Sequence, residues 1–412
     1  MKQSKAAKPV IRVLKFGGTC LHPEENRRHT LARIMEEVEQ GHQVVAVVSA
    51  MGRSGDPYAT DTLDTLLPRS IPRANRERDA LLCCGEEISA SVLAAELIAN
   101  RIPAVSLRGP QLGLFTKGAF GGAEIVNAHP QAIKKYLDQG CVVVAAGFQG
   151  VDSEGSLTTL GRGGSDTTAV ALAAALELDQ VFFFKDVEGL FSADPKIVPS
   201  AAPLPAIPYD EAAHLAYEGA RVLHPMSADL AKQQQISIRV RSLKTGSPGT
   251  LVSSSERIRD LRLRKNGLFA VTCLEGIGQL RVCPTESQSF PSFPCSLFES
   301  LAEAGISLDM INVLDREVFF TVASSDVSLA AGVAESCGCR PRVRSDCAKV
   351  SLLGGGIHGV PGIMARILST LAKVRVQVYQ SVDTYTVISV LVDEGHAPVA
   401  TRALHDAFEL SD

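Results

Sequence analysis

The stretch Thr158-Thr159-Leu160-Gly161-Arg162-Gly163-Gly164-Ser165-Asp166 gathers three glycines, a guanidinium, a hydroxyl and a carboxylate just before an apolar run at 169–178. Glycines adopt positive φ and let the backbone approach a ligand, and exposed amides in such a turn form a concavity for anions. Arg162 adds a planar fork that holds a carboxylate or phosphate at two points. The apolar run predicts a helix over 166–178 whose N-terminus adds positive dipole to the turn. The stretch indicates an anion-binding turn between strand and helix, with a plain tight connection as the alternative.

Strand and helix patterns alternate on both sides of this turn. Continuous apolar runs such as Gln43–Ser49 are typical of parallel strands that are covered on both faces. Strands are predicted at 10–16, 43–49, 104–107, 142–146 and 181–184, and helices at 26–40, 76–99, 131–139, 166–178 and 210–217. Repeated β-α-β units predict an α/β fold with a doubly wound, mainly parallel sheet that binds ligands at the carboxyl ends of its strands.

Four of these strand ends carry polar or glycine-rich loops, at 15–20, 49–52, 147–150 and 185–196. In the first loop, Lys15 precedes the pair Gly17 and Gly18, and a lysine in this position can meet the oxygens of a phosphate under transfer. Each loop alone is explained by an ordinary turn. All four at one edge of a sheet indicate a phosphate-transfer site. No G-x-x-x-x-G-K-[ST] motif is present, which excludes a P-loop NTPase.

Composition narrows the class of protein. The 412 residues are 45% hydrophobic and 21% charged, with a net charge of −4 and no Trp, which gives no reason to expect nucleic acid or an anionic membrane as a partner. No run approaches the ~18 apolar residues of a membrane helix. Residues 1–9 lack the apolar core of a signal peptide, so we expect a short disordered leader. The ten scattered cysteines lack zinc-site or redox-pair spacing, which favours a reducing cytoplasm and predicts no protein metal site.

Four separated motifs together resemble the aspartate kinases of the amino-acid kinase family. They are residues 15–19, the 161–166 turn, residues 186–195 and the segment 216–225. The resemblance implies an αβα sandwich over residues 10–245 that uses ATP and Mg²⁺ to phosphorylate the side-chain carboxylate of aspartate. It implies the first step of aspartate-derived amino-acid biosynthesis, leading to lysine and diaminopimelate, threonine and methionine.

The resemblance also assigns roles to individual residues. Lys15 and Asp166 take the positions implicated in phosphoryl transfer. Arg162 would hold the α-carboxylate of the substrate and Glu86 its ammonium, leaving the side chain free to react. The remaining substrate positions are Thr19, Cys20 and Ser165. The nucleotide positions are Gly17, Gly18, Lys185, Asp186, Phe191, Lys196 and Arg221.

Several residues depart from the family pattern. Cys20 stands where Ser is usual, and Lys185 stands where Thr is usual. Lys196 stands where Arg is usual, Arg221 stands where Lys is usual, and Met226 stands where a basic or small residue is common. We interpret the chain as a working kinase with altered nucleotide contacts. Two alternatives remain: a weakly active or inactive paralogue that senses an amino acid, and a kinase for another acidic amino acid.

The C-terminal part predicts a regulatory region after a turn-rich linker at 246–264. The order strand, helix, strand, strand occurs twice, with helices at 294–304 and 361–373 and strands at 270–282, 306–312, 318–323, 350–354, 376–380 and 386–392. This resembles tandem βαββαβ ACT modules, over 265–345 and 346–412, which bind amino acids. The resemblance implies feedback inhibition by lysine, threonine or diaminopimelate and at least a homodimer. The candidate effector residues are Asp309, Asn312, Gln380 and Asp383.

Overall fold

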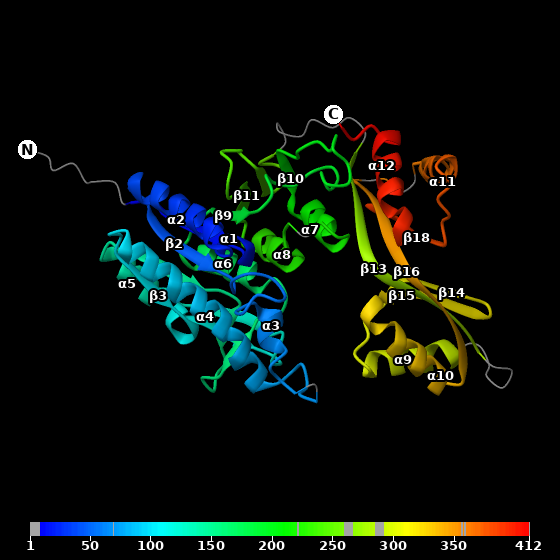
Figure 1. The fold of residues 1–412 in the computed structure, drawn as a ribbon, viewed down its shortest axis with the longest axis horizontal. Coiled ribbons are helices and arrows are strands. Elements are labelled where there is room, and N and C mark those ends of the chain that lie inside the picture. The colour runs from blue at the N-terminus through cyan, green and yellow to red at the C-terminus, as the bar shows by residue number, and fades with distance from the viewer. Residues whose placement is uncertain are drawn as a thin grey trace, which may run out of the picture. The chain divides into compact units, whose positions relative to one another are not determined.

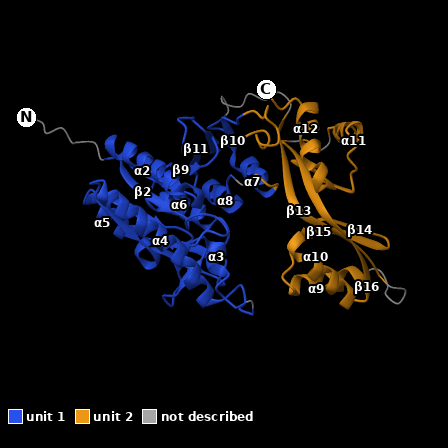
Figure 2. Cartoon of the chain, in the orientation of Figure 1, with its two compact units in different colours: residues 1–190, 203–217, 221–263 blue, residues 191–202, 218–220, 264–412 orange. Residues whose placement is uncertain are grey.

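The computed structural model describes residues 9–68, 70–220, 222–258, 267–284, 292–355, 357 and 360–411 (Figure 1). The predicted leader, apart from Pro9, and the last residues of the predicted linker, 259–264, lie outside the described residues. The chain forms two compact units (Figure 2). Unit 1 contains residues 1–190, 203–217 and 221–263, and unit 2 contains residues 191–202, 218–220 and 264–412.

Unit 1 is built on an eight-stranded sheet with the order β10-β12-β11-β9-β1-β2-β6-β3. All neighbouring strands are parallel except the pair β11 and β12. The strands are β1 (Ile11–Phe16), β2 (Gln43–Val48), β3 (Ala104–Leu107), β6 (Val142–Ala146), β9 (Gln180–Lys185), β10 (Ala206–Pro208), β11 (Ser237–Ser242) and β12 (Thr250–Ser253). The mainly parallel sheet that the apolar runs predict is confirmed.

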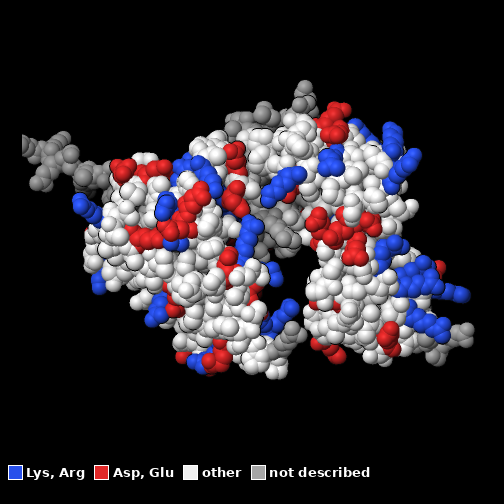
Figure 3. Space-filling view, in the orientation of Figure 1, with Lys and Arg blue, Asp and Glu red and all other residues white. Residues whose placement is uncertain are grey.

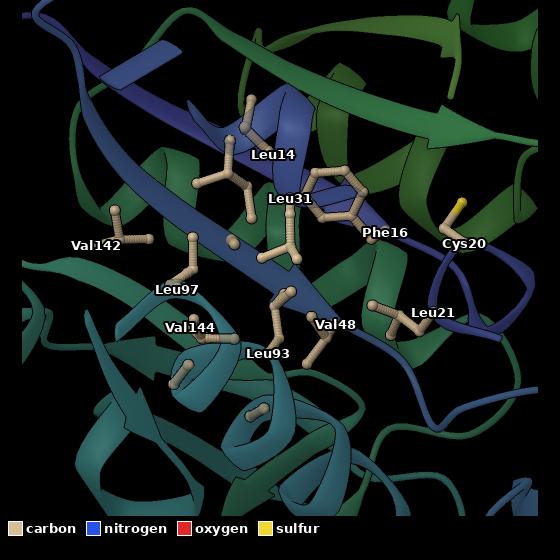
Figure 4. Close-up of a cluster of buried hydrophobic side chains, with 14 of the residues drawn as sticks. Leu14, Phe16, Cys20, Leu21, Leu31, Val48, Leu93, Leu97, Val142 and Val144 are labelled. Carbon is tan, nitrogen blue, oxygen red and sulfur yellow. The ribbon is translucent and has the colours of Figure 1, made fainter. Parts of the chain in front are cut away.

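Helices cover both faces of this sheet, so the predicted αβα sandwich is also confirmed. On one face, α2 (Glu24–Glu39) and α4 (Arg76–Ala99) contribute apolar side chains to a buried cluster with β1, β2 and β6 (Figure 4). Leu14, Phe16, Leu93 and Leu97 in this cluster are fully buried, and each such side chain stabilises the fold by about 1.5–3 kcal/mol. The other face carries α6 (Gly164–Ala175) against β1 and β9.

The alternation of side chains along β1 and β9 decides where their lysines lie. Phe16 and Phe184 stack at 5.1 Å between ring centroids on the face that bears the buried cluster. Because successive side chains point to opposite faces, Lys15 and Lys185 lie on the face covered by α6. The register, in which Lys15 is opposite Phe183, places both lysines near the first turn of that helix.

A four-stranded sheet with the order β5-β4-β7-β8 forms a second layer of unit 1 that the sequence patterns did not predict. Its strands are β4 (Leu114–Lys117), β5 (Glu124–Ala128), β7 (Gln149–Val151) and β8 (Leu157–Thr159). They have three to five residues each, too few for a clear alternation of apolar and polar positions. The stretch 158–166 thus runs directly from β8 into α6.

Unit 2 is a six-stranded antiparallel sheet with the order β14-β15-β13-β16-β18-β17. The strands are β13 (Leu268–Pro284), β14 (Asp309–Leu314), β15 (Glu317–Ala323), β16 (Cys339–Gly354), β17 (Gln380–Asp383) and β18 (Val387–Asp393). The helices are α9 (Ser292–Glu303), α10 (Val327–Ser336), α11 (Ile363–Lys373) and α12 (Ala397–Ala407). The predicted strand at 376–380 is wrong, because only its last residue, Gln380, begins the observed strand.

Two ACT-like modules share this sheet, and the long strands β13 and β16 run through both. One hydrophobic cluster contains Leu280 and Val282 from the end of β13, together with α9 and α10. The other contains Val271 from the start of β13, together with α11 and α12. The pair of C-terminal modules is confirmed, and the structure adds that the second module uses the first strand of the region.

Two segments that overlap the motifs at 186–195 and 216–225 belong to unit 2. In the segment 191–202, the Ser192 hydroxyl bonds His405 Nε2 of α12 at 2.9 Å and accepts from the Ala202 amide at 2.8 Å. In the segment 218–220, Glu218 accepts from the Ser351 hydroxyl and pairs with Lys349 at 3.1 Å. None of the helices in the described part of the chain is both long and apolar enough to cross a membrane.

Candidate active site

A cavity of about 1090 Å³ opens in unit 1 at the carboxyl ends of the parallel strands. Its lining comes from β1, β9, the 161–166 turn, helix α4 and the tip of the β4–β5 hairpin. The cavity brings together six of the residues that the sequence predicts for the site: Lys15, Glu86, Arg162, Ser165, Asp166 and Lys185. Pockets for small molecules usually measure about 300–1,000 Å³, so this cavity lies at the upper end of that range.

The turn before α6 depends on its glycines. Gly161 and Gly163 have φ of 71° and 73°, values that favour glycine. A Cβ atom at Gly163 would also collide with the ring of His224. The Asp166 and Thr167 amides donate to the Gly163 carbonyl, which starts α6 at Gly164. Ser165 and Asp166 therefore lie in the first helical turn, two residues earlier than the predicted start of the helix.

Asp166 holds two ammonium groups at the inner end of the cavity. Its carboxylate lies 2.6 Å from Lys15 Nζ and 3.4 Å from Lys185 Nζ. Burial opposes ionisation of Asp166, but the two lysines outweigh it and lower the pKa of the carboxyl to about 2. Burial lowers the pKa of Lys15, and Asp166 only partly offsets this effect. The cluster carries one net positive charge, which a phosphate would neutralise.

Glu86 and Arg162 supply a buried carboxyl group and an exposed guanidinium to the cavity, and neither has a full set of partners among the described residues. Glu86 is 2% exposed, and its Oε1 accepts from the Ala50 amide at 3.0 Å, whereas Oε2 has no hydrogen-bond partner among the described residues. Burial raises the pKa of Glu86 to about 8, against the effect of the Ala50 bond and of Lys15. Arg162 is exposed, and it takes part in none of the ion pairs formed within the described ranges. This arrangement suits a ligand that has both an ammonium and a carboxylate.

His224 also lines the cavity, although the sequence motifs assign it no separate role. It precedes α8 (Pro225–Gln233), and its ring lies against Gly163 of the turn. Burial lowers the pKa of this histidine, and its Nδ1 is buried without a hydrogen bond in the described structure. The ring of His224, whose pKa lies below the ordinary value of histidine, therefore covers the 161–166 turn at Gly163. The sequence already pointed to His224, because this residue belongs to the segment 216–225 that resembles the family.

Other candidate residues are placed elsewhere. Cys20 is 1% exposed in the hydrophobic cluster, and its thiol donates to the Phe184 carbonyl at 3.3 Å (Figure 4). Asp186 pairs with Arg53 at 2.9 Å on the surface. The candidates absent from the described cavity lining are Gly17, Gly18, Thr19, Cys20 and Asp186. Phe191 and Lys196 belong to unit 2, and Arg221 lies outside the described residues.

The four candidate effector residues of unit 2 fall into two groups. Gln380 bonds Asn312 at 2.6 Å and also donates to the Met310 carbonyl, while Asp309 pairs with Lys349 at 2.6 Å. These three candidates therefore use their polar groups within the protein. Asp383 instead lines a cavity of about 320 Å³ next to the N-terminus of α11.

Comparison with known proteins agrees with this geometry. Residues 11–242 match the model of the amino acid kinase family, and residues 342–406 match an ACT domain. Aspartokinase 1 of Bacillus subtilis is 40% identical over 97% of this chain and 99% of its own. The aspartokinase of Thermus thermophilus is 36% identical over 97% and 98%.

A solved structure shares the fold at lower identity. Escherichia coli aspartokinase III, in complex with aspartate and ADP, is 23% identical with a TM-score of 0.75 and covers 97% of this chain and 100% of its own. The face drawn in Figure 3 carries both basic and acidic side chains. The chain belongs to the amino acid kinase family and, within it, to the aspartokinases.

Proposed function

We propose that this protein phosphorylates the side-chain carboxylate of L-aspartate with ATP, giving 4-phospho-L-aspartate and ADP. The observation that carries the proposal is one cavity with an unbalanced Lys15–Asp166–Lys185 cluster at its inner end and unpaired Arg162 and Glu86 groups in its lining. The first group of residues fits phosphate oxygens and the second fits an amino acid. The reaction opens the biosynthesis of aspartate-derived amino acids.

The residues divide the work between charge neutralisation and positioning. Lys15 and Lys185 stabilise negative charge on the phosphoryl group as the P–O bond to ADP breaks and a bond to the substrate carboxylate oxygen forms. Asp166 keeps both ammonium groups in place. Arg162 binds the α-carboxylate and Glu86 the ammonium, so the side-chain carboxylate faces the phosphoryl group. This carboxylate is already ionised at pH 7, and no general base is needed.

Mg²⁺ fits the site as an ion that arrives with the phosphates of ATP. Within the described ranges no three His, Cys, Asp or Glu side chains come together as a metal site. Mg²⁺ is commonly held by one or two carboxylates together with substrate phosphates. Asp166 lies in the cavity beside the two lysines and would hold the ion there, whereas Asp186, after β9, pairs with Arg53 outside the cavity lining. When bound, the ion supplies further positive charge to the phosphates.

The same proposal includes feedback control by an amino acid at the second ACT-like module. Asp383 offers a carboxylate for the ammonium, and the N-terminus of α11 offers amides for the carboxylate, around the same 320 Å³ cavity. A structure of E. coli aspartokinase III is described with lysine and aspartate, which makes lysine the first effector to test here. Threonine and diaminopimelate follow.

We also propose that the protein is at least a homodimer. Strand β14 is an edge of the six-stranded sheet, and Ile311, Val313 and Leu314 on it are 46–52% exposed. Such an edge with exposed apolar side chains favours pairing with another chain. Light scattering at several protein concentrations measures the mass of the assembly, and a monomer at every concentration would reject the dimer.

The test of the kinase is ADP release with Mg-ATP and L-aspartate, with L-glutamate in a parallel reaction. We expect aspartate-dependent turnover that Arg162→Ala reduces by about 100-fold through the KM for aspartate. Arg28→Ala is the matched control, because Arg28 pairs with Glu24 at the surface and neither residue lines the cavity. A folded protein that binds an amino acid without ADP release would instead support the sensor alternative.

A further inference from the structure

Asp79 is a fully buried carboxylate that the proposed chemistry does not use. It is 0% exposed and lies in the first turn of α4, seven residues before Glu86. Since seven residues make about two helical turns, both side chains lie on the same face of α4. Both line the cavity. Helix α4 thus presents two buried carboxylates to one site.

The two carboxylates differ in their hydrogen bonds. Asp79 Oδ2 accepts from the Thr159 amide at 2.7 Å and the Gly121 amide at 3.0 Å, and Oδ1 accepts from the Thr159 hydroxyl at 3.0 Å. Glu86 keeps one oxygen without a partner among the described residues. Glu86 is therefore available to a ligand, whereas Asp79 uses its oxygens to hold the backbone.

The backbone that Asp79 holds forms the wall of the cavity next to Arg162. Thr159 ends β8 three residues before Arg162, and Gly121 lies at the tip of the β4–β5 hairpin. The Ala123 amide donates to the Thr159 carbonyl at 2.9 Å, which fixes the two segments to each other. Gly161 lies against the carbonyl of Gly121. Asp79 therefore fixes both the start of the arginine turn and the loop beside it.

We infer that Asp79 is a positioning residue that sets the distance between Arg162 and Glu86, and hence the length of the amino acid that the site accepts. The inference rests on the proposed function. One rigid helix carries the ammonium anchor directly and places the carboxylate anchor through Asp79. Aspartate and glutamate differ by one methylene, and a misplacement of about 1 Å at a reacting centre costs on the order of 100-fold in rate.

The kinetic test compares Asp79→Ala with Asp79→Asn. The asparagine side chain would keep the shape, accept from both amides through its oxygen and donate to the Thr159 hydroxyl, so Asp79→Asn should stay within about 3-fold of the wild type. Asp79→Ala should raise the KM for aspartate by about 10- to 100-fold, leave the KM for ATP within about 2-fold and reduce the preference for aspartate over glutamate. If Asp79→Asn is as impaired as Asp79→Ala, the charge of Asp79 matters rather than its positioning, and the inference is wrong.

Asp152→Ala is the matched control. Asp152 accepts from the Glu154 amide at 2.9 Å and the Ser156 amide at 2.8 Å, at the other end of β8, and it does not line the cavity. It should lower the melting temperature without changing the KM for aspartate. An Asp79→Ala protein that behaves in the same way has lost only stability, which would overturn the inference.

A second readout does not depend on catalysis. Trypsin cleaves after Arg162, and the rate at which the fragment ending there appears reports the freedom of the turn. Asp79→Ala should release it at least about 5-fold faster than the wild type or Asp152→Ala, at temperatures where all are folded. Equal rates would reject the positioning role even if no substrate is turned over, whereas absent ADP release from the wild type would reject only the proposed function. If Asp79→Ala does not fold, Asp79→Ser, whose hydroxyl is too short to span both amides, takes its place.

Discussion

Lys15 in unit 1 and Lys349 in unit 2 are equally buried, at 4% exposure, but they have opposite surroundings. Lys15 shares one carboxylate, Asp166, with a second ammonium group. Lys349 lies between two carboxylates, 3.1 Å from Glu218 and 2.6 Å from Asp309. Burial lowers the pKa of Lys15 and is not overcome, whereas at Lys349 the two carboxylates overcome burial and raise the pKa.

Burial alone therefore does not separate the two lysines, whereas the balance of charge around each of them does. A cluster of two ammonium groups and one carboxylate is completed by an anion from outside. A cluster of one ammonium and two carboxylates is complete without a ligand, and the Ser351 hydroxyl further satisfies Glu218. Lys15 is therefore expected to act on a ligand and Lys349 to hold the structure of unit 2.

Lys15→Met should give the largest effect, because it removes an ammonium group that meets the transferring phosphoryl group. We expect kcat to fall by about 100- to 1,000-fold while the protein remains folded. Steady-state ADP release and thermal melting measure the two quantities on the same samples. If kcat falls by less than about 5-fold, Lys15 is a structural lysine like Lys349, and the contrast between them fails.

Glu86 extends the comparison to a carboxylate with an incomplete set of partners. Its native pKa of about 8 lies above the ordinary 4.5, so between these pH values the native protein holds a proton that the unfolded chain has lost. The proton on Glu86 therefore contributes fully to the free energy of unfolding below about pH 4.5, and this contribution is lost as the pH rises to about 8. Glu86→Gln should therefore stabilise the ligand-free protein above pH 8 by roughly 1–3 kcal/mol.

The same variant should impair catalysis, since only the ionised carboxylate binds an ammonium group. In the wild type the KM for aspartate should rise as the pH falls below about 8. In Glu86→Gln it should be nearly independent of pH and about 100-fold higher than in the wild type at pH 9, with a smaller difference at pH 6. Urea denaturation and kinetics between pH 6 and 9 test both statements. A variant that is less stable at pH 9 would show that Glu86 is held by structural partners.

Lys349→Met should affect stability rather than turnover. The apolar side chain leaves Glu218 without its ammonium partner, which costs about 2 kcal/mol in the free energy of unfolding, less than the roughly 3–5 kcal/mol of a fully buried pair because Asp309 is half exposed. Without effector, kcat should change by less than about 3-fold. A large loss of turnover at unchanged stability would place Lys349 with Lys15 and end the distinction.

The sequence predicts the unit 1 site better than the Lys349 cluster, for a physical reason. Lys15 and Lys185 lie at the ends of strands whose apolar runs are local signals, and parallel strands bring their carboxyl ends to one edge of the sheet. Arg162 and Asp166 belong to the glycine-rich turn, which is visible in the sequence itself. Helix α4 is predicted at its observed bounds because its periodicity extends over 24 residues.

Pairings over long sequence distances could not be predicted. Asp79 contacts residues that are 42 and 80 positions away, and no local pattern marks it as different from any other helix-start carboxylate. The short strands of the four-stranded sheet, which position the Asp79 partners Thr159 and Gly121, also lack a local sequence pattern. The division of β13 between two modules could not be predicted either, because the sequence of one strand does not show which helices pack against each of its ends.

Cys20→Ser should have the smallest effect, and it tests where the site around Lys15 ends. Cys20 follows the glycines after β1, but its side chain lies in the hydrophobic cluster (Figure 4), and burial raises the pKa of the thiol. A serine hydroxyl can donate to the same Phe184 carbonyl. We expect kcat and both KM values within about 2-fold of the wild type and a stability change of about 1 kcal/mol.

Ser165→Ala is the control for this prediction, because Ser165 lines the cavity and Cys20 does not. It should raise the KM for aspartate by at least about 3-fold, since a hydroxyl bonded to a ligand contributes about 1 kcal/mol. A Cys20→Ser protein that changes KM more than Ser165→Ala does would show that the reactive region includes residues outside the cavity lining. A residue would then belong to the site because it is close to Lys15 in the sequence and not because it lines the cavity. Charge balance at the cavity would no longer separate Lys15 from Lys349.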